Sequence, residues 1–352
     1  MVLSFFLHII LACSYLYIKE GQVMEHKDIG IYEKVLEYIS LELSNTLSKI
    51  PAIYKASTEE IRLRSGAPLN IYCMNKDYFV TREGMITNDK EKGVIVERSD
   101  IIKTFQLISN YSVYAFEEEI RNGFITLKGG HRVGIAGKVL YSANGIDKIK
   151  NISSLNIRIA REKIGISDKL IRFIIDYPNS IHNTLIVSPP QCGKTTILRD
   201  LIRNLSSGIG LLQGKGFKVG VIDERSEISG MYNGVPQHNI GPRTDVLDGC
   251  NKKDGTMMLL RAMSPEVIAM DEIGSIQDVE AIHEIIKAGV KIVATVHGSS
   301  VEDLLSRRSL NILVNDKIFK RYVFLDNSLG VGTIRSVIDG DKFTTIEKGV
   351  IC

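Results

Sequence analysis

The sequence predicts an α/β domain with a mostly parallel sheet, preceded by a smaller α+β domain. Three observations favour this class. From about residue 165, short apolar runs alternate with segments of helical periodicity, as in doubly wound folds. The apolar runs are uninterrupted, as expected for strands buried on both faces. Residues 24–150 instead mix helical segments with short strands separated by glycine and proline.

The length and composition are those of a globular protein with two domains. The 352 residues suffice for two cores of ordinary size. A net charge of +3 is too small to indicate a nucleic-acid partner by itself. The cysteines are scattered and form no C-x-x-C pair, which argues against a disulfide framework or a zinc site and favours a reducing compartment. They are Cys13, Cys73, Cys192, Cys250 and Cys352.

Residues 1–23 form an apolar segment with two open interpretations. The first 18 residues, MVLSFFLHIILACSYLYI, carry no Lys, Arg, Asp or Glu. This is slightly short of the roughly 20 residues that span a bilayer, and the basic start of a signal peptide is missing. The segment is either a membrane anchor or an artefact of a start assigned too early, with translation beginning at Met24.

The first domain is expected over residues 24–160. It opens with an amphipathic helix whose apolar face includes Val35, Ile39 and Leu43. The stretch 59–72, EEIRLRSGAPLNIY, predicts a strand or the edge of a hairpin. Residues 108–124 are typical of a helix that ends near a glycine. Residues 125–141 predict a hairpin around a Gly-Gly turn.

The second domain is expected over residues 165–352. Buried strands are predicted at 184–188, 218–222, 267–270 and 290–295. Helices are predicted at 195–205, 276–288 and 301–309. The second of these begins with Ser275 and Asp278 at the spacing of a capping box.

A candidate phosphate-binding loop lies between the first of these strands and its helix. Residues 185–200 read LIVSPPQCGKTTILRD, close to the pattern G-x-x-x-x-G-K-[ST]. Gly193 lets the backbone close around phosphate, Lys194 reaches the β- and γ-phosphate oxygens, and the Thr195 hydroxyl binds Mg²⁺. The expected nucleotide contacts are Ser188, Pro189, Pro190, Gln191, Cys192, Gly193, Lys194, Thr195 and Thr196.

Ser188 stands where the pattern has its first glycine. That glycine only allows the strand to turn into the loop, and a small serine can replace it. The following Pro189-Pro190 stiffens the turn. The alternative is a chance Gly-Lys-Thr at the start of a helix.

A second motif lies 77 residues after the loop lysine. The stretch VIAMDEIG, residues 267–274, is an apolar strand that ends in two carboxylates. Asp271 is predicted to hold Mg²⁺, usually through water, and Glu272 to orient or deprotonate the attacking water. The alternative is a strand that merely ends in acidic residues. The two motifs together predict ATP binding, and the glutamate favours hydrolysis over binding alone.

Two further strands end in side chains that fit the same site. VGVIDERSEISG, residues 219–230, leads into Asp223 and Glu224, where ligands bind in such sheets. The alternative interpretation is that Asp223 and Glu224 lie in a solvent-exposed turn with no role in a site. IVATVHG ends in His297, which could sense the γ-phosphate through a hydrogen bond, although a lone histidine is usually structural.

With these stretches in view, the chain resembles the stage III sporulation protein AA family. More broadly it is similar to the hexameric ATPases of type II and type IV secretion and of pilus retraction. The resemblance covers most of the chain from about residue 30. The stretches that carry it are EEIRLRSGAPL (59–69), GGHRVGIAGKV (129–139), SSLNIRIARE (153–162), PPQCGKTTILRDLIR (189–203), VIDERSEISG (221–230), GPRTDVLDGC (241–250), MMLLRAMSPEVIAMDEIG (257–274) and ATVHG (294–298).

The resemblance implies a RecA-like P-loop ATPase core behind the N-terminal domain, assembled as a homo-oligomeric ring, expected to be a hexamer. It implies ATP and Mg²⁺ as cofactors and membrane proteins of a sporulation channel as partners. The expected place is the mother-cell cytoplasm, peripheral at the inner face of the membrane. Asp223 and Glu224 match the acidic strand-end box of the secretion relatives, and His297 matches their histidine box.

The resemblance also implies that arginines of the N-terminal domain complete the site. Arg158 and Arg161 of NIRIAR are the candidates, because guanidinium suits a transition-state phosphate; the alternative is surface ion pairing. The chain departs from the family where Ser188 and Gln191 replace common loop glycines, and at its apolar first 23 residues. The bulkier Gln191 is expected to reduce nucleotide affinity or turnover.

The leading hypothesis is a Mg²⁺-dependent ATP hydrolase that powers a secretion-like channel, or its assembly, from mother cell to forespore during endospore formation. One rival is a nucleotide-dependent scaffold of the same channel that does not hydrolyse ATP. Another is a nucleic-acid translocase, since RecA-like cores also move DNA. The absence of tryptophan and of a strong basic stripe argues against the translocase, so no nucleic-acid partner is expected.

Overall fold

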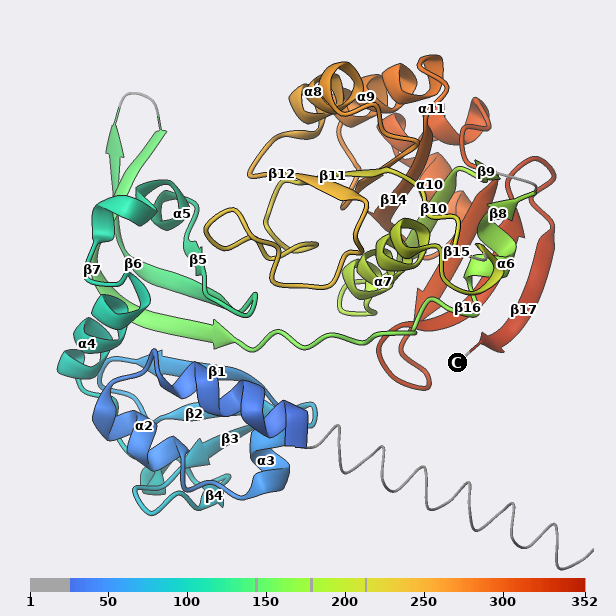
Figure 1. The fold of residues 1–352 in the computed structure, drawn as a ribbon. Helices are drawn as coiled ribbons and strands as arrows, with labels where there is room; N and C mark the ends of the chain where they lie inside the picture. The colour runs from blue at the N-terminus through green and yellow to red at the C-terminus, as the bar shows by residue number, and fades with distance from the viewer. Residues whose placement is uncertain (1–25, 143–144, 178–179, 213, 352) are drawn as a thin grey trace, which may run out of the picture. The chain divides into compact units, whose positions relative to one another are not determined.

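The chain folds into two compact units, Met1–Arg161 and Glu162–Cys352 (Figure 1). The computed structural model describes residues 26–142, 145–177, 180–212 and 214–351. The apolar segment 1–23, and with it the choice between an anchor and a late start, lies outside these residues. Within them, no helix combines the length and the apolar character needed to cross a bilayer.

The N-terminal unit is built on a seven-stranded sheet in the order β4-β3-β2-β1-β7-β6-β5. Every neighbouring pair in it is antiparallel. The strand or hairpin edge expected over 59–72 and the hairpin expected over 125–141 are confirmed as the antiparallel pairs β1–β2 and β5–β6, and β1 lies inside the sheet between β2 and β7. The strands are β1 (Thr58–Arg64), β2 (Asn70–Cys73), β3 (Lys76–Val80), β4 (Ile86–Thr87), β5 (Phe124–Thr126), β6 (Arg132–Ser142) and β7 (Gly145–Arg158).

Helices of this unit pack on the apolar face of the sheet to make one core. They are a helix over 26–36, α2 (Leu41–Leu47), α3 (Ala52–Ser57), α4 (Arg98–Ile108) and α5 (Glu117–Arg121), with 3₁₀ turns η1 (Lys90–Lys92) and η2 (Val113–Phe116). Val35, Ile39 and Leu43 are buried as predicted, but the single helix expected to carry all three is wrong, because the opening helix ends at residue 36 and Leu43 belongs to α2. The opening helix stops before Ser40, whose hydroxyl donates to Asp100 Oδ1 at 2.7 Å.

The helix expected over 108–124 is wrong. Helix α4 already ends at Ile108, and η2 and the short α5 follow. Asn110 and Tyr111 have φ values of 46° and 58°, and such left-handed residues terminate an α-helix.

The C-terminal unit contains an eight-stranded sheet in the order β12-β11-β13-β14-β10-β15-β16-β17. In this order, the neighbouring strands from β12 through β11, β13, β14 and β10 to β15 pair in parallel. The pairs β15–β16 and β16–β17 are antiparallel. The strands are β10 (Thr184–Ser188), β11 (Val219–Asp223), β12 (Thr244–Asp248), β13 (Val267–Met270), β14 (Lys291–His297), β15 (Arg321–Asp326), β16 (Thr333–Asp339) and β17 (Thr345–Ile351). A separate ribbon joins β8 (Ile175–Asp176) to β9 (Ser180–Ile181).

Helices cover both faces of this sheet. They are α6 (Ile171–Ile174), α7 (Lys194–Ser207), α8 (Lys252–Ala262), α9 (Ile276–Lys287), α10 (Val301–Ser306) and α11 (Arg308–Asn315), with a 3₁₀ turn η3 (Gly210–Leu212). Ile186 of β10 packs in one core cluster with α7, whereas Leu185 and Val187 pack in the other with α9 and α11. Strand β10 is therefore buried on both faces, which explains its uninterrupted apolar run.

The predicted fold class is confirmed: a mostly parallel α/β core with flanking helices follows a smaller α+β unit. The four predicted strands and the helices of 195–205 and 276–288 are present, the latter with the expected Ser275–Asp278 capping box. The single helix expected over 301–309 is wrong. Arg307 has extended φ and ψ of −99° and 119° and divides it into α10 and α11. Its guanidinium donates to His297 O at 2.6 Å and pairs with Asp303.

Candidate functional site

The predicted phosphate loop connects β10 to the first turn of α7. Gln191 and Gly193 have φ values of 62° and 85°, so the loop turns sharply before the helix. A Cβ atom at Gly193 would lie 2.7 Å from Val331 Cγ1 and 2.9 Å from Gly332 N. Position 193 therefore requires glycine for two reasons: its backbone is left-handed, and a second segment lies against it. Ser188, in place of the first glycine, is fully buried at the end of β10.

Lys194 lies beneath this loop with only 6% of its surface exposed. Its Nζ contacts His297 Nδ1 at 2.9 Å and donates to Pro189 O at 3.4 Å. Burial lowers the pKa of the ammonium group, and the nearby carboxylates of Asp271 and Glu272 oppose that shift. A buried cation close to a phosphate loop is suited to bind an anionic ligand.

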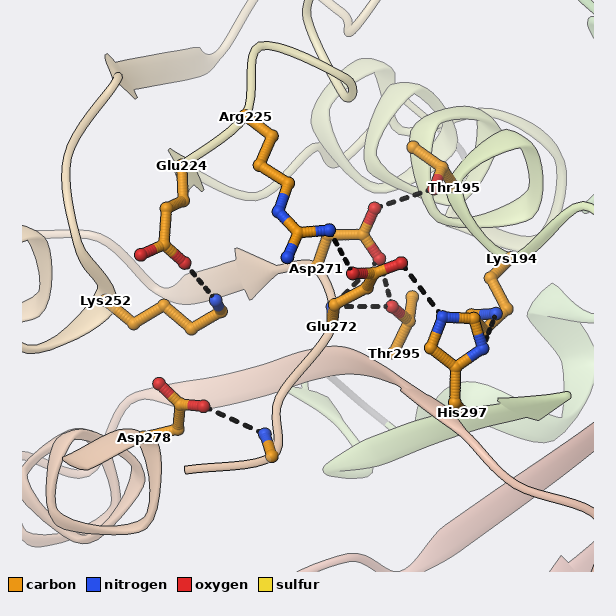
Figure 2. Close-up of polar contacts among 11 residues, drawn as sticks. Lys194, Thr195, Glu224, Arg225, Lys252, Asp271, Glu272, Asp278, Thr295 and His297 are labelled. Atoms are coloured by element: carbon orange, nitrogen blue, oxygen red, sulfur yellow. Dashed lines mark hydrogen bonds and ion pairs between the residues drawn. The ribbon is translucent and has the colours of Figure 1, made fainter. Parts of the chain in front are cut away.

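The two acids that follow β13 lie opposite the loop (Figure 2). Thr195 Oγ1 donates to Asp271 Oδ2 at 2.6 Å, so the two motifs meet although 76 residues separate them. The hydroxyl of Thr295, a fully buried residue of β14, donates to the other oxygen of Asp271. The same hydroxyl accepts the backbone N–H of Glu272 at 2.9 Å.

Glu272 is held from two sides. Its Oε1 lies 3.0 Å from His297 Nε2, and its Oε2 accepts from Arg225 Nη1 at 2.5 Å. Because Lys194 donates to Nδ1, the imidazole fits the tautomer that carries its proton on Nε2 and donates to Glu272. A continuous chain of contacts thus runs from Lys194 through His297 and Glu272 to Arg225 (Figure 2).

Glu272 also has a φ of 48°, which is unusual for a residue with a side chain. Such a conformation costs about 1–3 kcal/mol and persists only where surrounding contacts fix it. The hydrogen bond from its N–H to Thr295 is one such contact. Backbone strain at a carboxylate held between a histidine and an arginine is typical of a functional site.

Asp223 and Glu224, at the end of β11, do not join this chain of contacts. Asp223 is buried, and its carboxylate accepts the backbone N–H groups of residues 227–229 and the hydroxyl of Ser229. It therefore fixes the loop that carries Arg225. Glu224 forms an ion pair with Lys252 of α8.

The two arginine candidates belong to the N-terminal unit. Arg161 donates to Thr58 O at 2.5 Å and Lys55 O at 3.2 Å, and its Nε lies 3.2 Å from Asp28 Oδ1. These contacts hold its guanidinium within its own unit. Arg158 lies at the end of β7 with its side chain exposed.

Sequence reasoning missed Thr295 and assigned no role to Arg225. Thr295 is a hydroxyl residue inside the buried part of strand β14, whose other buried residues are apolar, and it lies two positions before His297 and so on the same face. A lone polar residue in a buried strand is the signal that could have identified it. Arg225 follows two acids at a strand end, and nothing in that pattern indicates its pairing with Glu272.

Comparisons with known proteins identify relatives of the chain. A family model described as sporulation stage III, protein AA, matches residues 31–344. Stage III sporulation protein AA of Bacillus subtilis (strain 168) is 41% identical over 308 residues, covering 88% of this chain and 95% of that protein. Protein SEEDLING PLASTID DEVELOPMENT 1 of Arabidopsis thaliana is 31% identical over 179 residues, covering 49% of this chain and 25% of its own.

A solved structure shows the same fold. The ATPase DotB of Legionella pneumophila aligns with a TM-score of 0.50 and 14% sequence identity, covering 76% of this chain and 72% of DotB. At this level of identity the similarity concerns the fold. The C-terminal core thus has the RecA-like α/β fold.

Proposed function

Because the chain belongs to the sporulation stage III protein AA family, we propose that it is a Mg²⁺-dependent ATP hydrolase that acts during endospore formation. The hydrolysis cycle would drive a secretion-like channel between mother cell and forespore, or its assembly. The observation that carries the proposal is the meeting of two motifs at one sheet edge: Thr195 Oγ1 and Asp271 Oδ2 lie 2.6 Å apart beside Lys194 and Glu272.

The residues present fit a magnesium–nucleotide complex. The hydroxyl of Thr195 and the carboxylate of Asp271 are hard oxygen donors, the kind that Mg²⁺ prefers, and phosphate oxygens and water would supply the rest. Bound Mg²⁺ would neutralise charge that develops on the β- and γ-phosphates. Thr295 fixes the orientation of Asp271 for this role.

Each remaining side chain has a task in hydrolysis. When nucleotide binds, the Nζ of Lys194 leaves His297 Nδ1 and contacts the β- and γ-phosphate oxygens. The Nδ1 of His297 is then available for a hydrogen bond with the γ-phosphate. Glu272 orients or deprotonates the attacking water, which requires one carboxylate oxygen to leave Arg225 or His297. Asp223 supports this by holding the loop of Arg225.

The wider setting is part of the same proposal. The chain acts as a homo-oligomeric ring, expected to be a hexamer, peripheral at the membrane of the mother cell and attached to membrane proteins of the channel. A ring follows if one subunit completes the nucleotide site of the next, since a head-to-tail interface closes only that way. Arg158 remains our candidate for the completing arginine, because its guanidinium is exposed, whereas Arg161 is held by its own unit.

One observation favours a second candidate, a nucleotide-dependent scaffold that does not turn over. Both carboxylate oxygens of Glu272 are engaged, by Arg225 and His297. If nucleotide binding leaves these contacts in place, Glu272 cannot accept a proton from water, and binding alone would set the state of the channel.

The test is phosphate release from Mg-ATP by the full chain, with Lys194→Ala and Glu272→Gln beside it. Glu280→Gln is the matched control, because that acid lies exposed on α9 and pairs only with Lys253 among described residues. We expect turnover in the parent and control and a loss on the order of 100-fold or more in both site variants. Glu272→Gln should still bind ATP, and Lys194→Ala should not.

One result separates the two candidates, and a second tests the role of Glu272. Nucleotide binding without turnover in the parent would support the scaffold. Turnover that survives Glu272→Gln unchanged would remove Glu272 from the reaction and overturn the assignment.

A further inference from the structure

We infer that the turn between β15 and β16, residues 327–332, binds the base of the nucleotide, with Leu329 and Val331 as its apolar contacts. This rests on the proposed function, which places phosphates on the loop of 188–195. It goes further by naming which part of the molecule recognises the nucleoside.

The strand order fixes the direction in which the nucleotide runs. Strand β10, which leads into the phosphate loop, lies between β14 on one side and β15 on the other. Asp271 and Glu272 follow β13 and His297 ends β14, so the two acids and the histidine assigned to the terminal phosphate lie on the β14 side of the loop. These strands are parallel, and their carboxyl ends meet at one edge of the sheet. A nucleotide with its terminal phosphate there extends its nucleoside toward β15.

The turn after β15 touches the phosphate loop directly. Gly332 N donates to Cys192 O at 3.0 Å. Val331 lies against Gly193, because a Cβ atom added to Gly193 would be 2.7 Å from Val331 Cγ1. The turn is itself ordered by local contacts: Thr333 Oγ1 donates to Gly330 O at 2.7 Å, and Gly330 N donates to Asn327 O at 3.1 Å. It is therefore a fixed wall of the site.

The chemistry of the turn suits a flat aromatic ring. Leu329 and Val331 are 67% and 42% exposed, so they present apolar surface beside the phosphate loop against which a flat ring can pack. Residues 327–332, NSLGVG, contain no charged side chain, so the turn has no cation to pair with a phosphate. The carboxylate of the preceding Asp326 accepts from the N–H and hydroxyl of Ser328. The occupant we assign is the purine base, held by burial of its face against Leu329 and Val331.

Titration calorimetry with two ligands tests this in the full chain. Mg-ATP carries a base, whereas inorganic triphosphate with Mg²⁺ presents only the phosphates. Leu329→Ser should raise the Kd for Mg-ATP about tenfold, since it removes apolar area from the contact, and leave the Kd for triphosphate unchanged. Leu329→Phe should lower the Kd for Mg-ATP. Met258→Ser, at a residue of α8 that is 53% exposed, is the control and should alter neither Kd.

Two outcomes would overturn the inference. Equal weakening of both ligands by Leu329→Ser would mean that the turn shapes the phosphate loop and does not contact the base. Unchanged ATP binding would place the base elsewhere. Failure of the proposed function would give a different result. The parent protein would bind neither ligand, or its Kd for each ligand would equal that of Lys194→Ala. The inference about the base would then fail as well.

Discussion

Thr295 joins the two acids of the candidate site through one hydroxyl, which donates to Asp271 and accepts from the backbone of Glu272. Thr295→Val keeps the shape of the side chain and removes both bonds. We expect kcat for ATP hydrolysis to fall about 10- to 100-fold, the usual effect of losing the group that orients a metal ligand. The Kd for nucleotide should change much less, because Lys194 and the loop are intact. Steady-state phosphate release and titration calorimetry measure the two quantities.

Thr295→Ser is the matched control for that prediction. It restores the hydroxyl and should recover most of kcat, whereas a merely structural role of the methyl group would leave it impaired. A Thr295→Val protein with the turnover of the parent would show that Asp271 needs no support from β14.

The site residues separate into those that the sequence could predict and those that it could not. Lys194, Thr195, Asp271 and Glu272 follow from motif spacing, because each motif lies at the end of an apolar strand. The pairing of Arg225 with Glu272 depends on side-chain direction across two loops, which no spacing encodes. For Asp223 the strand end was predictable, whereas its inward direction, toward residues 227–229, was not.

At the scale of elements, a buried carboxylate helps to attach α7 to the segment that precedes the sheet, beside hydrogen bonds from Asn204 to Ser167 and Asp168. Asp200 accepts the N–H groups of Gly165 at 3.0 Å and Ser167 at 2.8 Å, and it pairs with Arg203 at 2.7 Å. Asp200→Ala should lower the free energy of unfolding by about 3–5 kcal/mol, because it leaves the arginine charge buried without this partner. Urea unfolding followed by circular dichroism measures the change.

Asp168→Ala provides the comparison at the same arginine. Asp168 lies 3.5 Å from Arg203 and its side chain is 57% exposed, so its removal should cost far less. Similar losses for both variants would mean that the cost at Asp200 does not come from burial.

Elements were predictable where local sequence and burial agree. Strands β10 and β13 have their predicted bounds because each is an uninterrupted apolar run buried on both faces. The break at Arg307 was not predictable, since contacts with Asp303 and the distant His297 O stabilise it. Strands β16 and β17 were also missed. In β16 buried and exposed positions follow no regular order, so its sequence shows neither the two-residue period of a strand nor the 3.6-residue period of a helix.

For the whole molecule, each unit has a core of its own. The cluster of the N-terminal unit draws its buried residues from 32–159, and the two clusters of the C-terminal unit draw theirs from 170–337. A unit that buries its apolar surface internally is expected to fold alone. The division of the chain near residue 161 therefore also separates the hydrophobic cores.

Residues 162–352 produced without the N-terminal unit should therefore form a cooperatively folded protein. We expect a circular dichroism spectrum of mixed helix and strand and a single unfolding transition in urea, because both core clusters of the unit share strands of one sheet. Since the phosphate loop and both acids belong to this unit, Mg²⁺ with inorganic triphosphate should raise its unfolding midpoint, by about 2.7 kcal/mol of added stability at 100 times Kd.

Lys194→Ala in the same fragment is the control and should unfold at the same midpoint with and without triphosphate. A fragment that unfolds without a cooperative transition would show that the two cores of the C-terminal unit depend on residues 1–161. A fragment that folds but gains no stability from triphosphate, when the full chain does, would locate part of the phosphate site in the N-terminal unit. That result would turn attention to its arginines, Arg158 first, because the guanidinium of Arg161 is already bound to Thr58 O and Lys55 O.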